Sequence, residues 1–169
     1  PPNPDFADFM GQALVPWLHA QGLDVPAART VLAGSSYGGL ASSYVALRYP
    51  QLFGNVLSLS GSYWWAPKGE APNALARWWV VAPATATQFY LDAGRYESAR
   101  GGQAGILETS RDLGDVLRAK GHTVVQTAHN TGHDYVHWQG SLACGLVALL
   151  NPQASILQQP ACAPGLAAP

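Results

Sequence analysis

The residues with the clearest chemical potential are Gly34, Ser36 and Gly38, which form a G-x-S-x-G pattern between an apolar run and a helical segment. At a strand-turn-helix junction this pattern is typical of a nucleophilic serine whose hydroxyl is exposed above a sheet. Because glycine has no Cβ atom, strand and helix can approach closely, and the backbone at the glycines can take dihedral angles that other residues resist. The helix dipole favours negative charge beside the serine. The pattern therefore predicts acyl transfer, with Ser36 as nucleophile and the backbone N–H of Tyr37 as one half of an oxyanion hole.

A serine hydroxyl attacks an ester only when a base removes its proton, so a histidine must reach Ser36. His133 is preferred because it lies in the polar loop after the last predicted strand and follows Gly132, which is expected to let the backbone turn sharply. Two other histidines belong to the same loop: His129 and His137. The remaining two lie in a helical segment and a turn and are expected to be solvated: His19 and His122.

The third member of such a triad is a carboxylate that orients the histidine and lies between serine and histidine in the sequence. The end of the third predicted strand and the loop after it offer Asp92 and Glu97. Glu97 is preferred because it lies beyond a glycine turn and its longer side chain can reach back. Asp92 closes the strand, where an aspartate more often caps the following turn. Both stay open as the acid, whereas Asp134, next to His133, is expected to be structural.

The composition is that of a globular protein, with 169 residues of which 48% are hydrophobic and 11% charged. This length suits one domain with a sizeable core. A net charge of −1 without a basic run argues against nucleic acid as a partner. No apolar run reaches the roughly 18 residues of a membrane span, so no membrane partner is expected. Cys144 and Cys162 have no partner at metal-ligand spacing, so we expect no metal site and two unpaired thiols.

Short apolar runs alternate with amphipathic segments along the chain. Strands are predicted at residues 30–34, 55–60, 87–92 and 123–128. Helices are predicted at residues 5–21, bent or broken near Pro16, and at 40–49, 105–120 and 138–150. Such alternation predicts an α/β fold whose mostly parallel sheet has helices on both faces. Ser36, Glu97 and His133 each follow a strand, so they are expected to meet at the carboxyl edge of the sheet.

The sequence resembles the enterochelin (ferric enterobactin) esterases, a group within the α/β-hydrolase superfamily, from about residue 2 to residue 150. The resemblance rests on residues 33–40, 53–65, 92–97 and 132–134, together with Trp138 and Gly140. It implies that Ser36 is the nucleophile, His133 the base and Glu97 the acid. It also implies hydrolysis of the serine trilactone of catecholate siderophores and of their iron complexes, without a cofactor.

A catecholate substrate is aromatic and, when loaded with iron, anionic. The resemblance therefore suggests that Trp64 and Trp65 stack on catechol rings and that Arg95 offsets negative charge. The tryptophans are equally expected to pack beneath the edge of the sheet. A generic carboxylesterase acting on feruloyl, acetyl or thioester substrates is the alternative enzyme. An inactive fragment or binding module is the alternative from another class.

Residues 1–152 are expected to form the C-terminal portion of a single α/β-hydrolase domain, because the second oxyanion donor of this fold comes from a loop well before the nucleophile. We expect the N-terminal strands of the domain to lie outside this sequence and the site to need them. Residues 153–169, rich in Pro and Ala, are expected to be a flexible tail. A cytoplasmic location is favoured, with the periplasm as the alternative.

Overall fold

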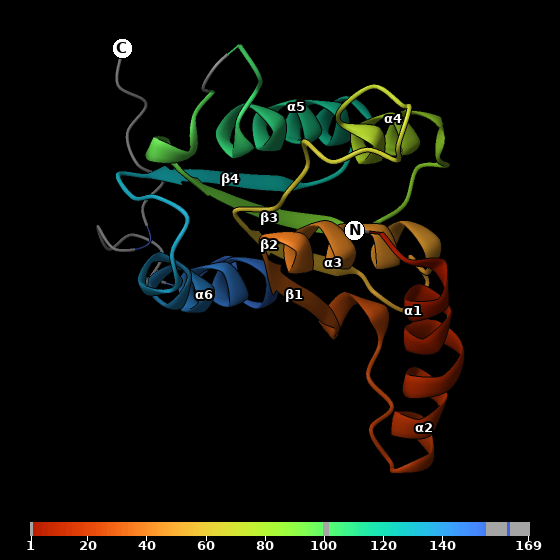
Figure 1. Cartoon of the computed structure of the whole chain (residues 1–169). Coiled ribbons are helices and arrows are strands. Elements are labelled where there is room, and N and C mark those ends of the chain that lie inside the picture. Colours follow the sequence, from red (N-terminus) through yellow and green to blue (C-terminus); the bar gives the residue numbers. More distant parts are fainter. Residues whose placement is uncertain (1, 100–101, 155–161, 163–169) are drawn as a thin grey trace.

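The computed structural model describes residues 2–99, 102–154 and 162, and its centre is one parallel sheet. The strands are β1 (Val31–Ser35), β2 (Asn55–Leu59), β3 (Gln88–Gly94) and β4 (Val124–His129). They lie side by side in the order β1-β2-β3-β4, and each neighbouring pair is parallel (Figure 1). The predicted α/β fold is confirmed, with each strand found within about two residues of its expected ends.

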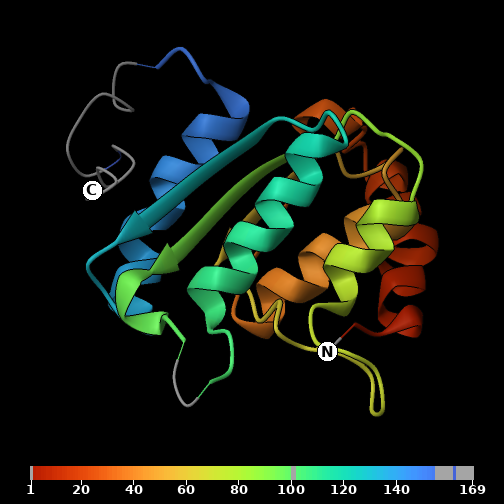
Figure 2. The ribbon, with the colours of Figure 1, turned by 90° about the horizontal axis from the view of Figure 1, so that it is seen from above.

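Helices cover both faces of the sheet (Figure 2). On one face lie α3 (Tyr37–Arg48), α4 (Ala74–Val81) and α5 (Ile106–Ala119), and on the other lies α6 (Tyr135–Leu150). Each face has its own apolar cluster, because β-strand side chains alternate between the two faces. The larger cluster, on the α3 side, includes Leu40, Val45, Val56, Trp79, Phe89 and Leu113. The smaller cluster, on the α6 side, joins Leu57, Leu59, Tyr90, Trp138 and Leu149.

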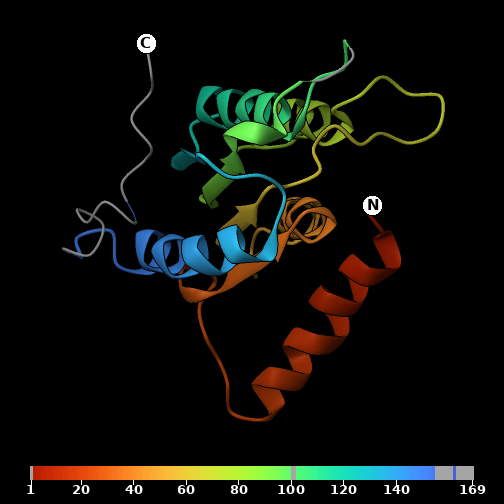
Figure 3. The same ribbon diagram turned by 60° about the vertical axis from the view of Figure 1, so that its left-hand side comes forward.

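The N-terminal helix is continuous but contains a widened turn. It runs through α1 (Pro4–Asp8), a π-helical segment (Phe9–Leu14) and α2 (Val15–Ala20), the red helix of Figure 3. The predicted distortion near Pro16 therefore takes the form of a π turn just before the proline, where the ring would otherwise press on the preceding turn. A salt bridge of 2.7 Å between Asp8 and Arg48 ties this helix to α3.

Helix α4 was not predicted, because its sequence is apolar almost all round and shows no clear period. It follows Asn73, whose backbone is left-handed with φ 62°. Its Trp79 is fully buried and makes edge contacts with Phe89 and His122 at centroid distances of 5.3 and 5.2 Å. The expectation that His122 is solvated is therefore wrong. Its ring is buried, and burial lowers its pKa.

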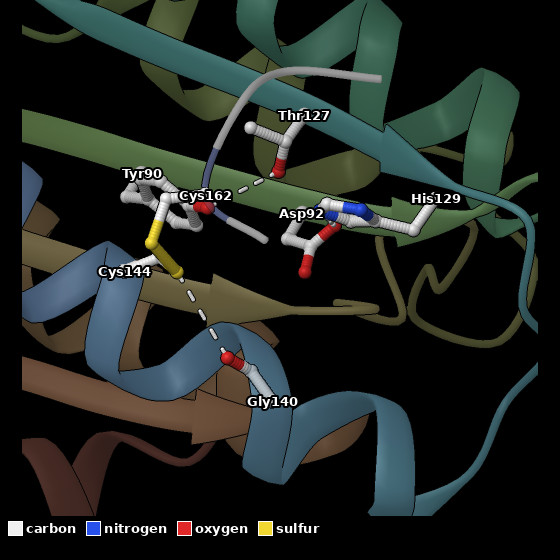
Figure 4. Close-up of a disulfide and its surroundings, with 7 residues drawn as sticks. All are labelled: Tyr90, Asp92, Thr127, His129, Gly140, Cys144 and Cys162. Atoms are coloured by element: carbon white, nitrogen blue, oxygen red, sulfur yellow. Dashed lines mark hydrogen bonds and ion pairs between the residues drawn. A yellow bond between two sulfur atoms is a disulfide. The ribbon is translucent and has the colours of Figure 1, made fainter. Parts of the chain in front are cut away.

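The two cysteines form a disulfide, so the expectation of unpaired thiols is wrong. Cys144 lies in α6, and Figure 4 shows Cys162 meeting it on the α6 side of the sheet. A separation of 18 residues carries no pattern that would reveal the pairing. Most of the tail that we expected to be flexible, residues 155–161 and 163–169, lies outside the described residues. Among the helices that the structure describes, none is both long and apolar enough to cross a bilayer.

Reducing the disulfide should destabilise the protein, because the open chain gains conformational freedom in the unfolded state. For a loop of this length the loss is about 3 kcal/mol. Urea unfolding with and without a thiol reductant measures it directly. Cys162→Ser should match the reduced protein and should not respond to reductant. Equal unfolding midpoints for the oxidised and reduced wild type would show that the bond contributes no stability.

Candidate active site

The carboxyl ends of the four strands meet at one edge of the sheet, and the candidate residues follow them. Ser36 comes directly after β1, Glu97 lies three residues after β3, and His133 lies four residues after β4. Because all strands are parallel, three loops far apart in the sequence converge at this edge. The structure thus brings the three predicted catalytic candidates together.

Ser36 sits in a strained turn between β1 and α3, with φ 54° and ψ −122°. A Cβ atom at Gly34 would lie 2.4 Å from the carbonyl carbon of Gly38, so strand and helix can approach this closely only with glycine there. The N–H of Ser36 donates to the carbonyl of Leu59 over 2.9 Å, and its own carbonyl accepts from Leu40 over 3.2 Å. These contacts hold a conformation that costs roughly 1–3 kcal/mol for a residue other than glycine.

The His133 ring lies between Ser36 and Glu97. Its Nε2 is 3.0 Å from Ser36 Oγ, and its Nδ1 is 2.5 Å from Glu97 Oε1. An ionised carboxylate has no proton to give, so Nδ1–H donates to Glu97 and Nε2 is left to accept from the serine hydroxyl. This arrangement lets the ring remove the Ser36 proton while the carboxylate stabilises the resulting imidazolium.

The Glu97 carboxylate is held more tightly than the histidine it contacts. Glu97 ends a short 3₁₀ turn (Arg95–Glu97), and its Oε2 accepts from the backbone N–H of Gly94 over 2.6 Å and from Ser60 Oγ over 2.7 Å. Its side chain is 4% exposed, against 40% for His133. A fixed, buried acid therefore meets a base that substrate and water can reach.

Asp92, the alternative acid, contacts two other histidines instead of His133. Its Oδ2 lies 3.2 Å from His137 Nε2, and its Oδ1 lies 3.7 Å from His129 Nε2. The Asp92 side chain is fully buried. The contact with Asp92 raises the pKa of His137 despite the burial of the ring. Geometry therefore places Glu97, rather than Asp92, beside the candidate base.

The Asp92 contacts hold both ends of the loop that carries His133. His129 ends β4 and His137 belongs to the first turn of α6, so one buried carboxylate faces both ends of the loop. Asp134 caps α6 by accepting from the backbone N–H of His137 over 2.9 Å, which is a structural contact. Gly132 does not adopt a left-handed backbone, although the chain bends at the adjacent His133.

Two further groups lie close to the Ser36 hydroxyl. Tyr37 is the first residue of α3, where an N–H has no acceptor within the helix, so this amide is free to face developing negative charge. Ser62 Oγ lies 3.3 Å from Ser36 Oγ. We assign no second oxyanion donor among the described residues.

A cavity of about 970 Å³ opens beside His133 and Glu97. Trp64 and Tyr96 line it with exposed aromatic rings, and Ile106 adds an apolar side chain. The ring of Trp64 also contacts that of Tyr37, at a centroid distance of 5.9 Å. The described lining therefore suits a substrate with aromatic groups.

Two of the residues expected to bind substrate, Trp65 and Arg95, do not line this cavity. Trp65 packs against the larger apolar cluster, with its ring 6.4 Å from that of Trp78 in an edge contact. Arg95 lines a separate cavity of about 220 Å³ beside α5, together with Arg111 and Arg118. Adjacent side chains on these loops point in different directions, which sequence spacing does not reveal.

Three residues near the site carry the family resemblance but were given no role from the sequence: Ser60, Ser62 and Trp138. The available signal was the run of alternating serines that ends the central strand beside the nucleophile strand. Trp138 gave no signal for this role, because an aromatic residue in an apolar helix is expected to be core.

Within the described part of the chain, no group of three His, Cys, Asp or Glu residues is arranged to hold a metal ion.

Comparison with known proteins gives consistent matches. A family model described as "Putative esterase" matches residues 1–149. The iron(III) enterobactin esterase of Dickeya dadantii is 34% identical over 137 residues, and that of Escherichia coli K12 is 33% identical over 156 residues. The crystal structure of the Shigella flexneri enterobactin esterase in the presence of enterobactin superposes with a TM-score of 0.76 at 32% identity.

These matches include most of this chain but a smaller part of each relative. They cover 75% of the chain and 31% of the Dickeya protein, and 90% of the chain and 38% of both the Escherichia and the Shigella proteins. The chain thus spans about a third of the length of the relatives it matches.

The ion pair between Asp92 and His137 should make stability depend on pH. A histidine whose pKa is raised in the folded state contributes stability that is complete below its unfolded pKa, near 6.5, and is lost as pH rises through the folded value. Asp92→Asn removes the cause of the shift. The stability gap between wild type and variant in urea unfolding should therefore be larger at pH 6 than at pH 8, by about 1.4 kcal/mol per pKa unit.

The comparison between the two proteins cancels the opposite contribution of His122, whose lowered pKa is common to both. A gap that stays constant from pH 6 to pH 8 would contradict the assigned ion pair.

Proposed function

Since this chain belongs to the Esterase family, we propose that it carries the catalytic triad of a serine esterase that cleaves carboxylic ester bonds through an acyl-enzyme. One observation supports this most strongly, namely the unbroken contact from Ser36 Oγ through the His133 ring to Glu97. Chain order and spacing suggested these three residues, and the geometry gives each the partner that its role needs.

In the proposed reaction His133 Nε2 takes the Ser36 proton as the serine oxygen attacks the ester carbonyl. The carbonyl oxygen becomes an oxyanion, which the N–H of Tyr37 and the positive end of α3 stabilise. The C–O bond to the alcohol then breaks, and His133 gives its proton to the leaving oxygen. Water, activated by the same histidine, hydrolyses the acyl-enzyme and restores Ser36. Glu97 stabilises the imidazolium at each stage without taking its proton.

The substrate that we propose is the trilactone of a catecholate siderophore. Iron(III) enterobactin esterases are among the relatives, and the Shigella flexneri protein was crystallised in the presence of enterobactin. The cavity beside the triad is large enough for an aromatic acyl group, and Trp64 and Tyr96 offer ring faces for stacking on catechols. An ester of an aromatic acid such as ferulate fits the same features and is the second candidate.

The two candidates predict different rates. The intact protein should hydrolyse a catecholate trilactone faster, by kcat/KM, than a feruloyl or p-nitrophenyl ester. A Trp64→Ala variant should raise KM for the trilactone more than for p-nitrophenyl acetate, because one ring face for stacking is lost. Hydrolysis of the simple esters but not of the trilactone would instead favour a generic carboxylesterase.

The disulfide is informative about the cellular compartment of the protein. Stable disulfides form in oxidising compartments and are rare in the cytosol, where thiols are kept reduced. We therefore propose the periplasm or another oxidising compartment in place of the cytoplasm that the sequence favoured. Alkylation of the native protein in cell extracts, followed by mass spectrometry, tests this. Cys144 and Cys162 should be protected until reductant is added, and two freely alkylated cysteines would exclude the proposal.

The roles of the two carboxylates can be separated by isosteric changes. Glu97→Gln keeps its shape but cannot stabilise the imidazolium, so kcat should fall about 10³–10⁴-fold. Asp92→Asn should reduce kcat far less when rates are normalised to folded protein. Labelling by a fluorophosphonate should occur at Ser36 and vanish in Ser36→Ala. An unlabelled wild type would rule out the serine mechanism. Equal losses of kcat in the two carboxylate variants would contradict the assignment of Glu97 as the acid.

A further inference from the structure

Ser60 leaves the central strand in a conformation that is unusual for its residue type. It follows β2 with φ 51°, in the left-handed region, and is fully buried. Its N–H donates to the carbonyl of Asp92 over 2.7 Å, which continues the ladder between β2 and β3. Strained residues that the surrounding structure holds in place are concentrated at functional sites. We therefore expect the Ser60 side chain to have a functional role.

The Ser60 hydroxyl has two partners, which fix the direction of its proton. Trp138 Nε1 lies 3.0 Å away, and the indole N–H can only donate. Glu97 Oε2 lies 2.7 Å away, and an ionised carboxylate can only accept. The Ser60 oxygen therefore accepts from Trp138 and its proton points at Glu97. No other assignment satisfies all three groups.

Trp138 also contacts the candidate base. Its ring meets that of His133 edge to face, with centroids 4.8 Å apart and planes at 90°. The indole is mostly buried, and Tyr135 packs on it at a centroid distance of 5.1 Å. One side chain of α6 thus packs against His133 and, through Ser60, orients Glu97.

From these contacts we propose that Ser60 and Trp138 are positioning residues that hold the Glu97 carboxylate in line with His133, a role that rests on the proposed serine esterase function. Two donors, Ser60 Oγ and the N–H of Gly94, occupy Oε2, so Oε1 alone is turned to the histidine. Without Ser60 Oγ, Oε2 would keep the N–H of Gly94 as the other of these two donors, so the carboxylate would be less restrained against rotation. The two hydrogen bonds from Trp138 to Ser60 and from Ser60 to Glu97, which we call the relay, keep Oε1 turned to His133.

Two variants remove the relay with little change to the fold. Ser60→Gly deletes the hydroxyl, and glycine adopts the left-handed backbone without strain. Trp138→Phe keeps an aromatic ring against His133 but removes the N–H, so the Ser60 hydroxyl is free to turn away from Glu97. Trp17→Phe, at an exposed indole in α2, is the matched control. Thermal unfolding checks that each variant is folded.

Each relay variant should lower kcat and the rate of fluorophosphonate labelling at Ser36 about 10- to 100-fold, as misplacements of about 1 Å do. KM should change little, because neither side chain lines the cavity. The control should keep wild-type rates. Wild-type rates in Ser60→Gly would overturn the proposal.

A double-mutant cycle separates positioning from a structural role. If Ser60 acts through the carboxylate, Ser60→Gly should cost little in a Glu97→Gln background, because the group it positions is already disabled. An equal cost in both backgrounds would show that Ser60 supports the fold alone. Failure of the proposed function gives a different result, in which the wild type is not labelled and Glu97→Gln has no effect.

Discussion

The site depends on how two neighbouring strands end. Ser36 after β1 and Ser60 after β2 both have a left-handed φ, of 54° and 51°. Each N–H donates to a carbonyl of the next strand, Leu59 in β2 and Asp92 in β3. One turn presents the candidate nucleophile, and the other presents a hydroxyl to the candidate acid. The first turn is possible because Gly34 has no Cβ atom, which would otherwise clash with the backbone of Gly38. The two strained turns thus lie at both ends of the proposed triad.

Two carboxylates at the carboxyl end of β3, Asp92 and Glu97, differ in how deeply their contacts are buried. Asp92 lies within β3, faces α6 and meets its histidines in a buried setting that suits a structural ion pair. Glu97 lies beyond the strand end, where its longer side chain reaches a histidine that solvent also reaches. A catalytic base must be accessible to substrate, whereas a structural pair gains from exclusion of water. Burial therefore separates two pairs that look alike in the sequence.

Chain order revealed the strands, the edge where they meet and the three residues that the structure brings together, because these follow from periodicity and from turn chemistry. Local spacing was insufficient wherever a contact joins distant segments. The disulfide, the burial of His122 against α4 and the bond from Trp138 to Ser60 all depend on packing. The surroundings of Trp65 and Arg95 also depend on packing, since Trp65 packs on the larger apolar cluster and Arg95 lines a separate cavity.

Helix α6 shows why the loop before it can hold a histidine at fixed distance from the serine. Asp134 caps its first turn, His137 pairs with buried Asp92, and the next residue bonds to Ser60. Two turns further on, Cys144 is joined covalently to Cys162. The helix is therefore fixed at its first turn and again along its length, and β4 is fixed by its ladder with β3. A short loop between two anchored elements has few conformations, so little entropy is lost in keeping His133 oriented.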